Sequence, residues 1–194
     1  EVLEQVYSSA QQLLEDGSYK QALLDYTKLI NSGFENDAIW VKRGLAHYYL
    51  EEYPQALNDF DEAYKRQIRS GELLGYRALT KYYLEDESGA ITGFEQAFAA
   101  GFKNTQAAYI TGNAYFQKKD YGTAIKYYNL GETWGSEEPV LFNNRGKAYF
   151  LSGDNGKAIA DFNKAIEINN EYAKARSNRA LTAFTEQQWD IAES

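Results

Sequence analysis

Residues 145–162 read RGKAYFLSGDNGKAIADF, and residues 43–60 read RGLAHYYLEEYPQALNDF. Both stretches open with Arg-Gly, carry an Ala twelve residues after that Gly and close with Asp-Phe. Their starts lie 102 residues apart (145 − 43), which is three times 34. A fixed interval of this size is typical of proteins built from tandem structural repeats.

The 34-residue interval holds along the whole chain. An alanine recurs, without any insertion, at Ala22, Ala56, Ala90, Ala124, Ala158 and Ala192. A large aromatic residue follows four positions later at Tyr26, Phe60, Phe94, Tyr128 and Phe162. A small residue precedes each alanine by twelve positions at Ala10, Gly44, Ala78, Gly112, Gly146 and Ala180. Several independent columns with one period indicate that each 34-residue unit has the same structure.

Each unit is predicted to contain two helices, because apolar and small residues recur at spacings of three and four. Turn residues such as Gly153-Asp154 separate the two helices. The second helix is expected to stop at Ser32-Gly33-Phe34, Ser70-Gly71, Ala100-Gly101-Phe102 and Trp134-Gly135-Ser136. A Gly followed by an apolar residue predicts a left-handed helix cap.

These residues resemble the tetratricopeptide repeat (TPR) family over essentially all of the chain. The fifth unit matches the family pattern of large, small and aromatic residues with Phe142, Gly146, Tyr149, Ala158, Phe162 and Ala165. The resemblance implies an all-α fold: an α-solenoid of tandem antiparallel helix pairs that forms a right-handed superhelix. The family's proline near the end of each unit is missing, and Gly-containing stops replace it.

The period predicts a single solenoid domain over residues 1–194. Its units cover about 3–36, 37–70, 71–104, 105–138 and 139–172, followed by a partial unit, 173–194, with a first helix at 173–186. Solenoids usually end in atypical polar capping units, and this sequence shows none. We therefore expect it to be a fragment of a longer protein.

An arginine precedes the small residue in four units: Arg43, Arg77, Arg145 and Arg179. An aspartate precedes the aromatic residue at Asp25, Asp59 and Asp161. We expect each carboxylate to pair with the arginine of the next unit, as Asp25–Arg43, Asp59–Arg77 and Asp161–Arg179, with Tyr127 stacking on Arg145. Such pairs would fix the angle between neighbouring units.

The composition narrows the classes of partner. A net charge of −8 and a pI near 4.8 argue against nucleic acid, whose binding needs a dense basic surface. No apolar run is long enough to insert into a membrane. The absence of cysteine removes disulfides and thiolate chemistry but leaves the compartment open, since cytoplasm and periplasm are both compatible.

Nothing in the sequence favours an enzyme, a cofactor or a metal. His47 is the only histidine, and its column holds Tyr115 and Tyr149 elsewhere, so we expect it to pack rather than to act as a base or ligand. Residues 153–157 contain Gly-Lys, but Leu151 and Ala158 stand where a phosphate loop needs Gly and Ser or Thr. We expect a non-catalytic protein.

The family resemblance implies that the first helix of each unit lines a groove for a partner segment. In the N-terminal half, the groove-facing columns hold Val41, Leu45, Leu79 and four tyrosines: Tyr48, Tyr49, Tyr82 and Tyr83. Tyrosine offers a large contact area at small entropic cost. The aromatic column 48, 82, 116, 150 and 184 has two open interpretations, ligand contact or packing between first helices.

In the C-terminal half, the groove-facing columns are more polar and hold Asn113, Asn143, Asn144, Lys147, Lys174 and Asn178, with Tyr109 and Phe116 among them. An asparagine can donate to and accept from a peptide backbone at the same time. Some family members grip a terminal carboxylate with two asparagines and three cations. This chain has Tyr109 and Asn178 at two of the cationic positions, which argues against such a clamp.

The sequence therefore predicts a protein–protein interaction scaffold whose groove binds an extended or helical peptide segment of a partner. Two alternatives stay open: a structural protein that self-associates, and the docking domain of a larger enzyme. The step from repeat to groove rests on analogy with the family.

Overall fold

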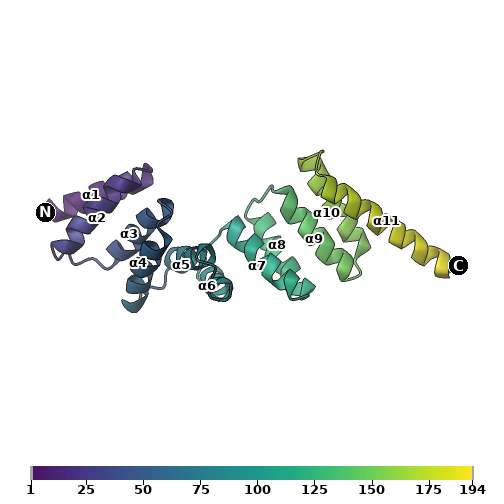
Figure 1. Cartoon of the computed structure of the whole chain (residues 1–194), viewed down its shortest axis with the longest axis horizontal. Coiled ribbons are helices and arrows are strands. Elements are labelled where there is room, and N and C mark those ends of the chain that lie inside the picture. Colours follow the sequence, from purple (N-terminus) through teal and green to yellow (C-terminus); the bar gives the residue numbers. More distant parts are fainter. Residues whose placement is uncertain (1, 194) are drawn as a thin grey trace. The chain divides into compact units, whose positions relative to one another are not determined.

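Figure 1 shows a computed structural model of the chain, which describes the backbone of residues 2–193 and the side chains of residues 2–187. Within that range the chain forms eleven α-helices and no strand. The all-α repeat fold predicted from the 34-residue period is confirmed. None of the described helices is both long and apolar enough to cross a membrane.

The helices divide into two compact units (Figure 1). The first unit ends at Phe102 and contains α1 (Val2–Glu15), α2 (Tyr19–Asn31), α3 (Ala38–Tyr49), α4 (Tyr53–Lys65), α5 (Gly71–Tyr83) and α6 (Glu87–Ala99). The second unit begins at Lys103 and contains α7 (Thr105–Gln117), α8 (Tyr121–Thr133), α9 (Pro139–Leu151), α10 (Asn155–Ile168) and α11 (Ala173–Glu193). The prediction of a single domain over 1–194 stays a prediction.

Each helix pair is held together where its two helices approach most closely. A Cβ atom added to Gly44 would lie 2.6 Å from the ring of Phe60, and one added to Gly146 would lie 2.7 Å from the ring of Phe162. The aromatic residue of the second helix thus covers the small residue of the first helix in the same repeat. This contact buries both columns and explains why they keep the period.

In every complete repeat, a residue in the left-handed conformation lies two positions after the last residue of the first helix. These residues are Gly17, Glu51, Glu85, Lys119 and Gly153, with φ between 60° and 89°. The next N–H groups then bond back to the helix, as Asp154 donates to the carbonyl of Tyr149 at 2.9 Å. Glycine adopts this conformation freely, whereas the side chains at positions 51, 85 and 119 strain it.

One predicted helix stop is wrong. Helix α4 ends at Lys65, and its left-handed residue is Gln67 rather than a residue of the Ser70-Gly71 pair. Ser70 instead begins the next helix, because its hydroxyl accepts a hydrogen bond from the Leu73 N–H at 3.2 Å. A Ser-Gly pair has the chemistry of a helix start as well as of a stop.

Helix α11 continues beyond its predicted end at residue 186 and reaches Glu193. No residue of this helix takes the left-handed conformation that ends the earlier first helices. Gln187 occupies that column, and its neighbours Glu186 and Gln188 favour a helix. The sequence period therefore does not impose a turn on this repeat.

The predicted pairing of each aspartate with the arginine of the next repeat is wrong. Arg43 binds Asp59 of its own repeat at 2.8 and 2.6 Å. Arg145 likewise binds Asp161 of its own repeat with two hydrogen bonds of 2.7 Å. The cause is the close contact between each small residue and the aromatic residue of its own repeat, which brings the preceding arginine and aspartate together.

Contacts between repeats still use the arginines, with other partners. Arg77 reaches Asp61 at 2.6 Å, and Arg179 reaches Asn163 at 2.8 Å. Arg145 adds Asn129 at 2.8 Å and the carboxylate of Glu132 to its own Asp161. Arg77, Arg145 and Arg179 thus join three first helices to the preceding repeat, through residues two positions after the predicted partners.

Candidate functional site

The first helices form the inner layer of each unit. In the first unit α3 contacts both α1 and α5, and in the second α9 contacts both α7 and α11. The second helices make no comparable contacts with one another in the part of the chain that the structure describes. The predicted site residues all lie on first helices, so each unit presents them on this layer.

A tyrosine cluster occupies this layer in the first unit, and it comprises Tyr19, Tyr48, Tyr49, Tyr53, Tyr76, Tyr82 and Tyr83. The rings of Tyr19 and Tyr49 stack with their centroids 4.7 Å apart, and so do those of Tyr53 and Tyr83. Tyr48 joins the two stacks, since its centroid lies 5.4 Å from that of Tyr49 and 5.8 Å from that of Tyr53.

The cluster is rigid on one side and open on the other. Tyr48 is half-buried, and Tyr49 shares a hydrogen bond of 2.6 Å between its hydroxyl and that of Tyr76. Burial raises the pKa of Tyr48, with a further contribution from Tyr83, and burial together with the Tyr76 hydroxyl raises that of Tyr49. The outer edges stay accessible: Tyr49 is 42% exposed, and Tyr82 and Tyr83 are each 38% exposed.

The structure brings the four predicted tyrosines into this cluster and removes three apolar residues from the predicted surface. Val41, Leu45 and Leu79 are buried in the core. A first helix turns its strongly apolar side chains toward its own second helix, so these residues pack there instead of lining a groove.

Sequence reasoning missed Tyr19, Tyr53 and Tyr76 as members of the cluster. Tyr19 and Tyr53 are the first residues of α2 and α4, and they lie 34 residues apart. The period therefore carried a signal for these two, although they belong to second helices. Tyr76 has no such signal, because its role depends on contacts with Tyr48, Tyr49 and Phe102.

An amide ladder of Asn113, Asn143, Asn144 and Asn178 occupies the same layer in the second unit. Asn178 donates to the side-chain oxygen of Asn143 at 2.9 Å, and Asn143 donates to that of Asn144 at 3.3 Å. Asn144 in turn donates to the side-chain oxygen of Asn113 at 3.1 Å. The four predicted asparagines thus form a continuous chain of hydrogen bonds across three first helices.

Two tyrosine hydroxyls complete the ladder. Tyr128 donates to the side-chain oxygen of Asn113 at 2.6 Å, and Asn144 donates to the hydroxyl of Tyr109 at 3.3 Å. Burial raises the pKa of Tyr128, with a smaller contribution from Tyr109. Asn143 is only 3% exposed, so it is the buried member of the ladder, whereas Asn113, Asn144 and Asn178 are partly exposed to solvent.

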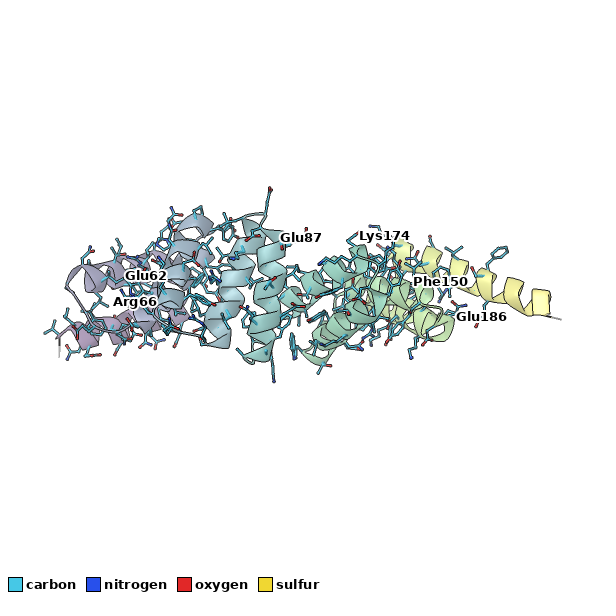
Figure 2. All side chains as sticks on the ribbon, turned by 90° about the horizontal axis from the view of Figure 1, so that it is seen from below. Glu62, Arg66, Glu87, Phe150, Lys174 and Glu186 are labelled. Atoms are coloured by element: carbon cyan, nitrogen blue, oxygen red, sulfur yellow. The ribbon has the colours of Figure 1, made fainter. Side chains whose placement is uncertain are left out.

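Two polar groups of the ladder are unused among the described residues: the amide nitrogen of Asn113 and the side-chain oxygen of Asn178. They offer one donor and one acceptor on the same layer. Lys147 places its ammonium 5.0 Å from the ring centroid of Phe116, and Lys174 projects from the first turn of α11 (Figure 2). The arrangement can hydrogen-bond a peptide backbone.

The structure gives the remaining candidates structural roles. His47 lies 2.6 Å from the carboxylate of Glu52 and 3.8 Å from that of Asp59. The turn at 153–157 is a helix cap in which Asp154 accepts from the Lys157 N–H at 3.1 Å. Within the described residues, no group of three or more His, Asp or Glu side chains could hold a metal ion.

Comparisons with known proteins agree with the geometry. A family model described as TPR repeat matches residues 146–185, and one described as Tetratricopeptide repeat matches residues 77–137. A search of curated protein sequences gives no match.

Solved structures similar to this chain include several TPR proteins. The C-terminal part of a TPR repeat-containing protein from Cytophaga hutchinsonii is 20% identical, with a TM-score of 0.69 over 91% of this chain and 69% of that one. YrrB, described as a TPR protein with an unusual peptide-binding site, is 19% identical, with a TM-score of 0.71 over 90% of each chain. MamA AMB-1 is 14% identical, with a TM-score of 0.72 over 87% of this chain and 92% of that one. At these identities the likeness shows the fold alone.

Proposed function

The chain belongs to the tetratricopeptide repeat family, and from this premise we propose that the first-helix layer of each unit binds an extended or helical peptide segment of a partner protein. Membership in the family supports a protein–protein interaction scaffold. Proteins of this family are typically non-catalytic. The peptide and the residues that hold it are the parts that we propose.

The exposed edges of the tyrosine cluster are the observation that carries the proposal. Tyr49, Tyr82 and Tyr83 expose ring area on α3 and α5, while their neighbours hold them in fixed orientations. Rings that are already ordered lose little further entropy when a partner covers them. This combination of exposure and order is typical of a contact surface.

The amide ladder supports the same proposal in the second unit. A peptide in contact with α7, α9 and α11 could accept a hydrogen bond from Asn113 and donate one to Asn178. Lys147 and Lys174 would add attraction for a carboxylate on the partner. The description of the structurally similar YrrB as a peptide-binding TPR protein is consistent with this role.

The proposal can be tested with a random peptide library displayed on phage, from which the purified chain selects the peptides that it binds. The affinity of a selected peptide is then measured by calorimetry for the chain and its variants. Tyr83→Ala should weaken a peptide that binds the first unit about tenfold or more, because aromatic anchors dominate such interfaces.

Leu24→Ala is the matched control, since Leu24 is also exposed but lies on the second helix α2. It should leave the affinity unchanged. The proposal would be contradicted if Leu24→Ala and Tyr83→Ala reduced the peptide affinity equally. It would also be contradicted if no selected peptide lost affinity when first-helix residues of either unit were changed.

A second candidate, self-association, is favoured by one observation on α11. Leu181 is 54% exposed and Phe184 is 60% exposed, side by side on the described part of this helix. Light scattering over a hundredfold range of concentration would give a rising mass if copies associate there. Phe184→Ser should then restore a constant mass near 22.1 kDa.

A further inference from the structure

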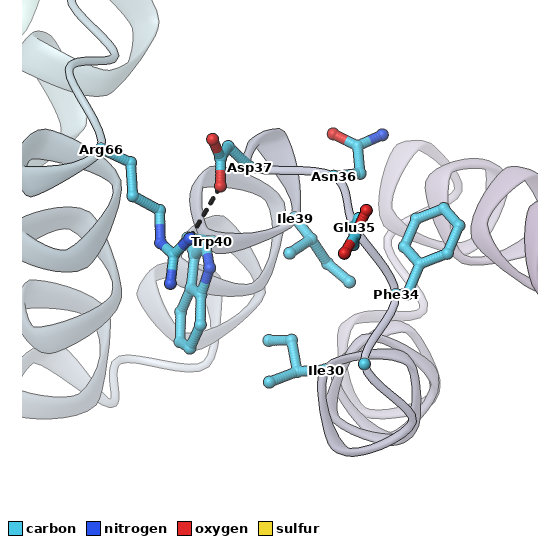
Figure 3. Close-up of a pocket in the computed structure, with 9 residues that line it drawn as sticks. Ile30, Phe34, Glu35, Asn36, Asp37, Ile39, Trp40 and Arg66 are labelled. Atoms are coloured by element: carbon cyan, nitrogen blue, oxygen red, sulfur yellow. Dashed lines mark hydrogen bonds and ion pairs between the residues drawn. The ribbon is translucent and has the colours of Figure 1, made fainter.

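A cavity of about 460 Å³ lies in the first unit outside the first-helix layer of tyrosines. Figure 3 shows the loop between α2 and α3 with the residues that line it, together with Arg66, which follows the end of α4. Its apolar wall consists of Ile30, Phe34, Ile39 and Trp40. Phe34 and Trp40 are partly exposed. The ring of Phe34 also packs against that of Tyr7, with centroids 5.4 Å apart, and the guanidinium groups of Arg43 and Arg66 lie 5.1 and 5.3 Å from the ring centroid of Trp40.

The charged residues at the opening leave one carboxylate in excess. Of the charged residues that line the cavity, Arg66 is paired with Asp37 at 2.9 Å (Figure 3), and it also binds Glu62, outside the cavity, at 3.1 Å. Glu35 also lines the cavity, is exposed and has no partner among the described residues. In the view of Figure 3, Glu35 lies between Phe34 and Ile39.

We propose that this cavity binds the lysine side chain of a partner protein. The four methylene groups of the lysine would contact Ile30 and the exposed part of Phe34, and its ammonium would reach Glu35. Long cationic side chains bury an apolar stem while the charged head stays in water, which matches an apolar wall with an acidic opening. A carboxylate is disfavoured, since Arg66 is already paired and the remaining charge is negative.

The equivalent place in the second unit, 102 residues later, shows which features differ. A cavity of about 520 Å³ lies there, lined by Glu137 at the position of Glu35. The aromatic walls are missing, because Ser136 replaces Phe34 and Phe142 replaces Trp40 and is buried. Lys164 of the chain itself lines this cavity, 3.5 Å from Glu167. This second cavity therefore serves as a control: it has a carboxylate, but it lacks an exposed aromatic wall and is already lined by a lysine of the chain.

The test is a titration of the whole chain with the tripeptide acetyl-Ala-Lys-Ala-amide, followed through the indole N–H resonance of Trp40. Trp40→Phe assigns that resonance. A peptide with norleucine in place of lysine keeps the apolar stem without the charge, and one with glutamate reverses the charge. The lysine peptide should bind about threefold more tightly than the norleucine peptide, and the glutamate peptide should cause no shift.

Glu35→Gln should abolish the preference for lysine over norleucine, while its melting temperature stays unchanged because Glu35 makes no internal bond. Glu137→Gln is the matched control and should keep the preference. About 0.5 M sodium chloride should reduce it, since the carboxylate is exposed. Equal binding of the two peptides, a preference that survives Glu35→Gln, or no shift with any peptide would overturn the proposal. Variants in the tyrosine cluster should leave the result unchanged, so this test and that of the first-helix layer fail separately.

Discussion

The two units share one helical frame but differ in charge and in the chemistry of their inner layers. The first unit has 17 acidic and 9 basic residues, a net charge of −8, whereas the second has 11 of each and is neutral. The first unit presents a cluster of tyrosine rings, most of them on its first helices, and the second presents hydrogen-bonded amides. All of the excess negative charge of the chain thus lies in the unit with the aromatic surface.

The comparison shows that the repeat constrains the buried columns and leaves the inner layer free to vary. Phe60 and Phe162 fill the same position against Gly44 and Gly146 in the two units. Other positions on the first helices have no such constraint, so tyrosines gather on those of the first unit and asparagines on those of the second. On the proposed function, the two units would bind partner segments of different chemistry: a cationic or aromatic one and one held by its backbone.

The largest expected difference concerns the two buried arginine pairs. Arg145→Leu should cost about 3 kcal/mol or more in free energy of unfolding, because it leaves Asp161 buried without its counter-charge. Arg43→Leu should cost less, since the Arg43 side chain is 18% exposed against 8% for Arg145 and pairs with one carboxylate rather than two. Urea unfolding measures both. The double variant Arg145→Leu/Asp161→Leu should recover most of the loss, and an equal cost for the two single variants would contradict this difference between the units.

A smaller difference is expected for two tyrosines in the same column. Tyr128→Phe should cost about 1 kcal/mol, because it removes the hydrogen bond that anchors the amide ladder. Tyr26 is equally buried, but its hydroxyl is the buried side-chain atom without a partner among the described residues. Tyr26→Phe should therefore be neutral or stabilising. A loss of stability in thermal unfolding equal to that of Tyr128→Phe would show that the Tyr26 hydroxyl is satisfied.

Substitutions at the left-handed residues should change the free energy of unfolding equally in both units. Equal changes would show that the units differ in their inner layers and not in their helical repeat. Glu51→Gly in the first unit and Lys119→Gly in the second should each stabilise the chain by about 0.5–1 kcal/mol, as the strain of a side chain at positive φ is removed. Gly153→Ala should have the opposite sign and a similar size. Chemical unfolding checks the three, and a stabilisation confined to one unit would contradict a common frame.

The smallest expected effect is on how the stability of individual helices depends on pH. Hydrogen bonds from Thr123 lower the pKa of Asp120, and those from Lys157 lower the pKa of Asp154, in the second unit. A lowered pKa stabilises the folded state above the ordinary value of 3.8 and loses that contribution as the pH falls below it. Helices α2 and α4 of the first unit have no side-chain cap. Hydrogen exchange between pH 5 and 3 should therefore show α8 and α10 losing protection more steeply than α2 and α4, and Asp120→Ala should remove this steepness for α8.

Much of the candidate site could be predicted from the sequence, because the period assigns each residue to a first or second helix. It placed Tyr48, Tyr49 and Tyr83 on first helices and Asn144 and Asn178 in equivalent columns. It could not separate Val41 or Leu45, which are buried, from the tyrosines that remain exposed on the same helix. That distinction depends on how far each first helix is rotated about its axis.

The sequence by itself determined the pair of helices in each complete repeat and the residues at which the two helices approach most closely. These follow from local chemistry, since a small residue and an aromatic residue recur every 34 residues. Only the tertiary structure decided which partner each long side chain has: Arg43 binds Asp59 and not Asp25, and Tyr128 finds an acceptor where Tyr26 does not. The physical reason is the length of these side chains. A side chain of several bonds can contact residues on either adjacent helix, and the packing of those helices selects one of them.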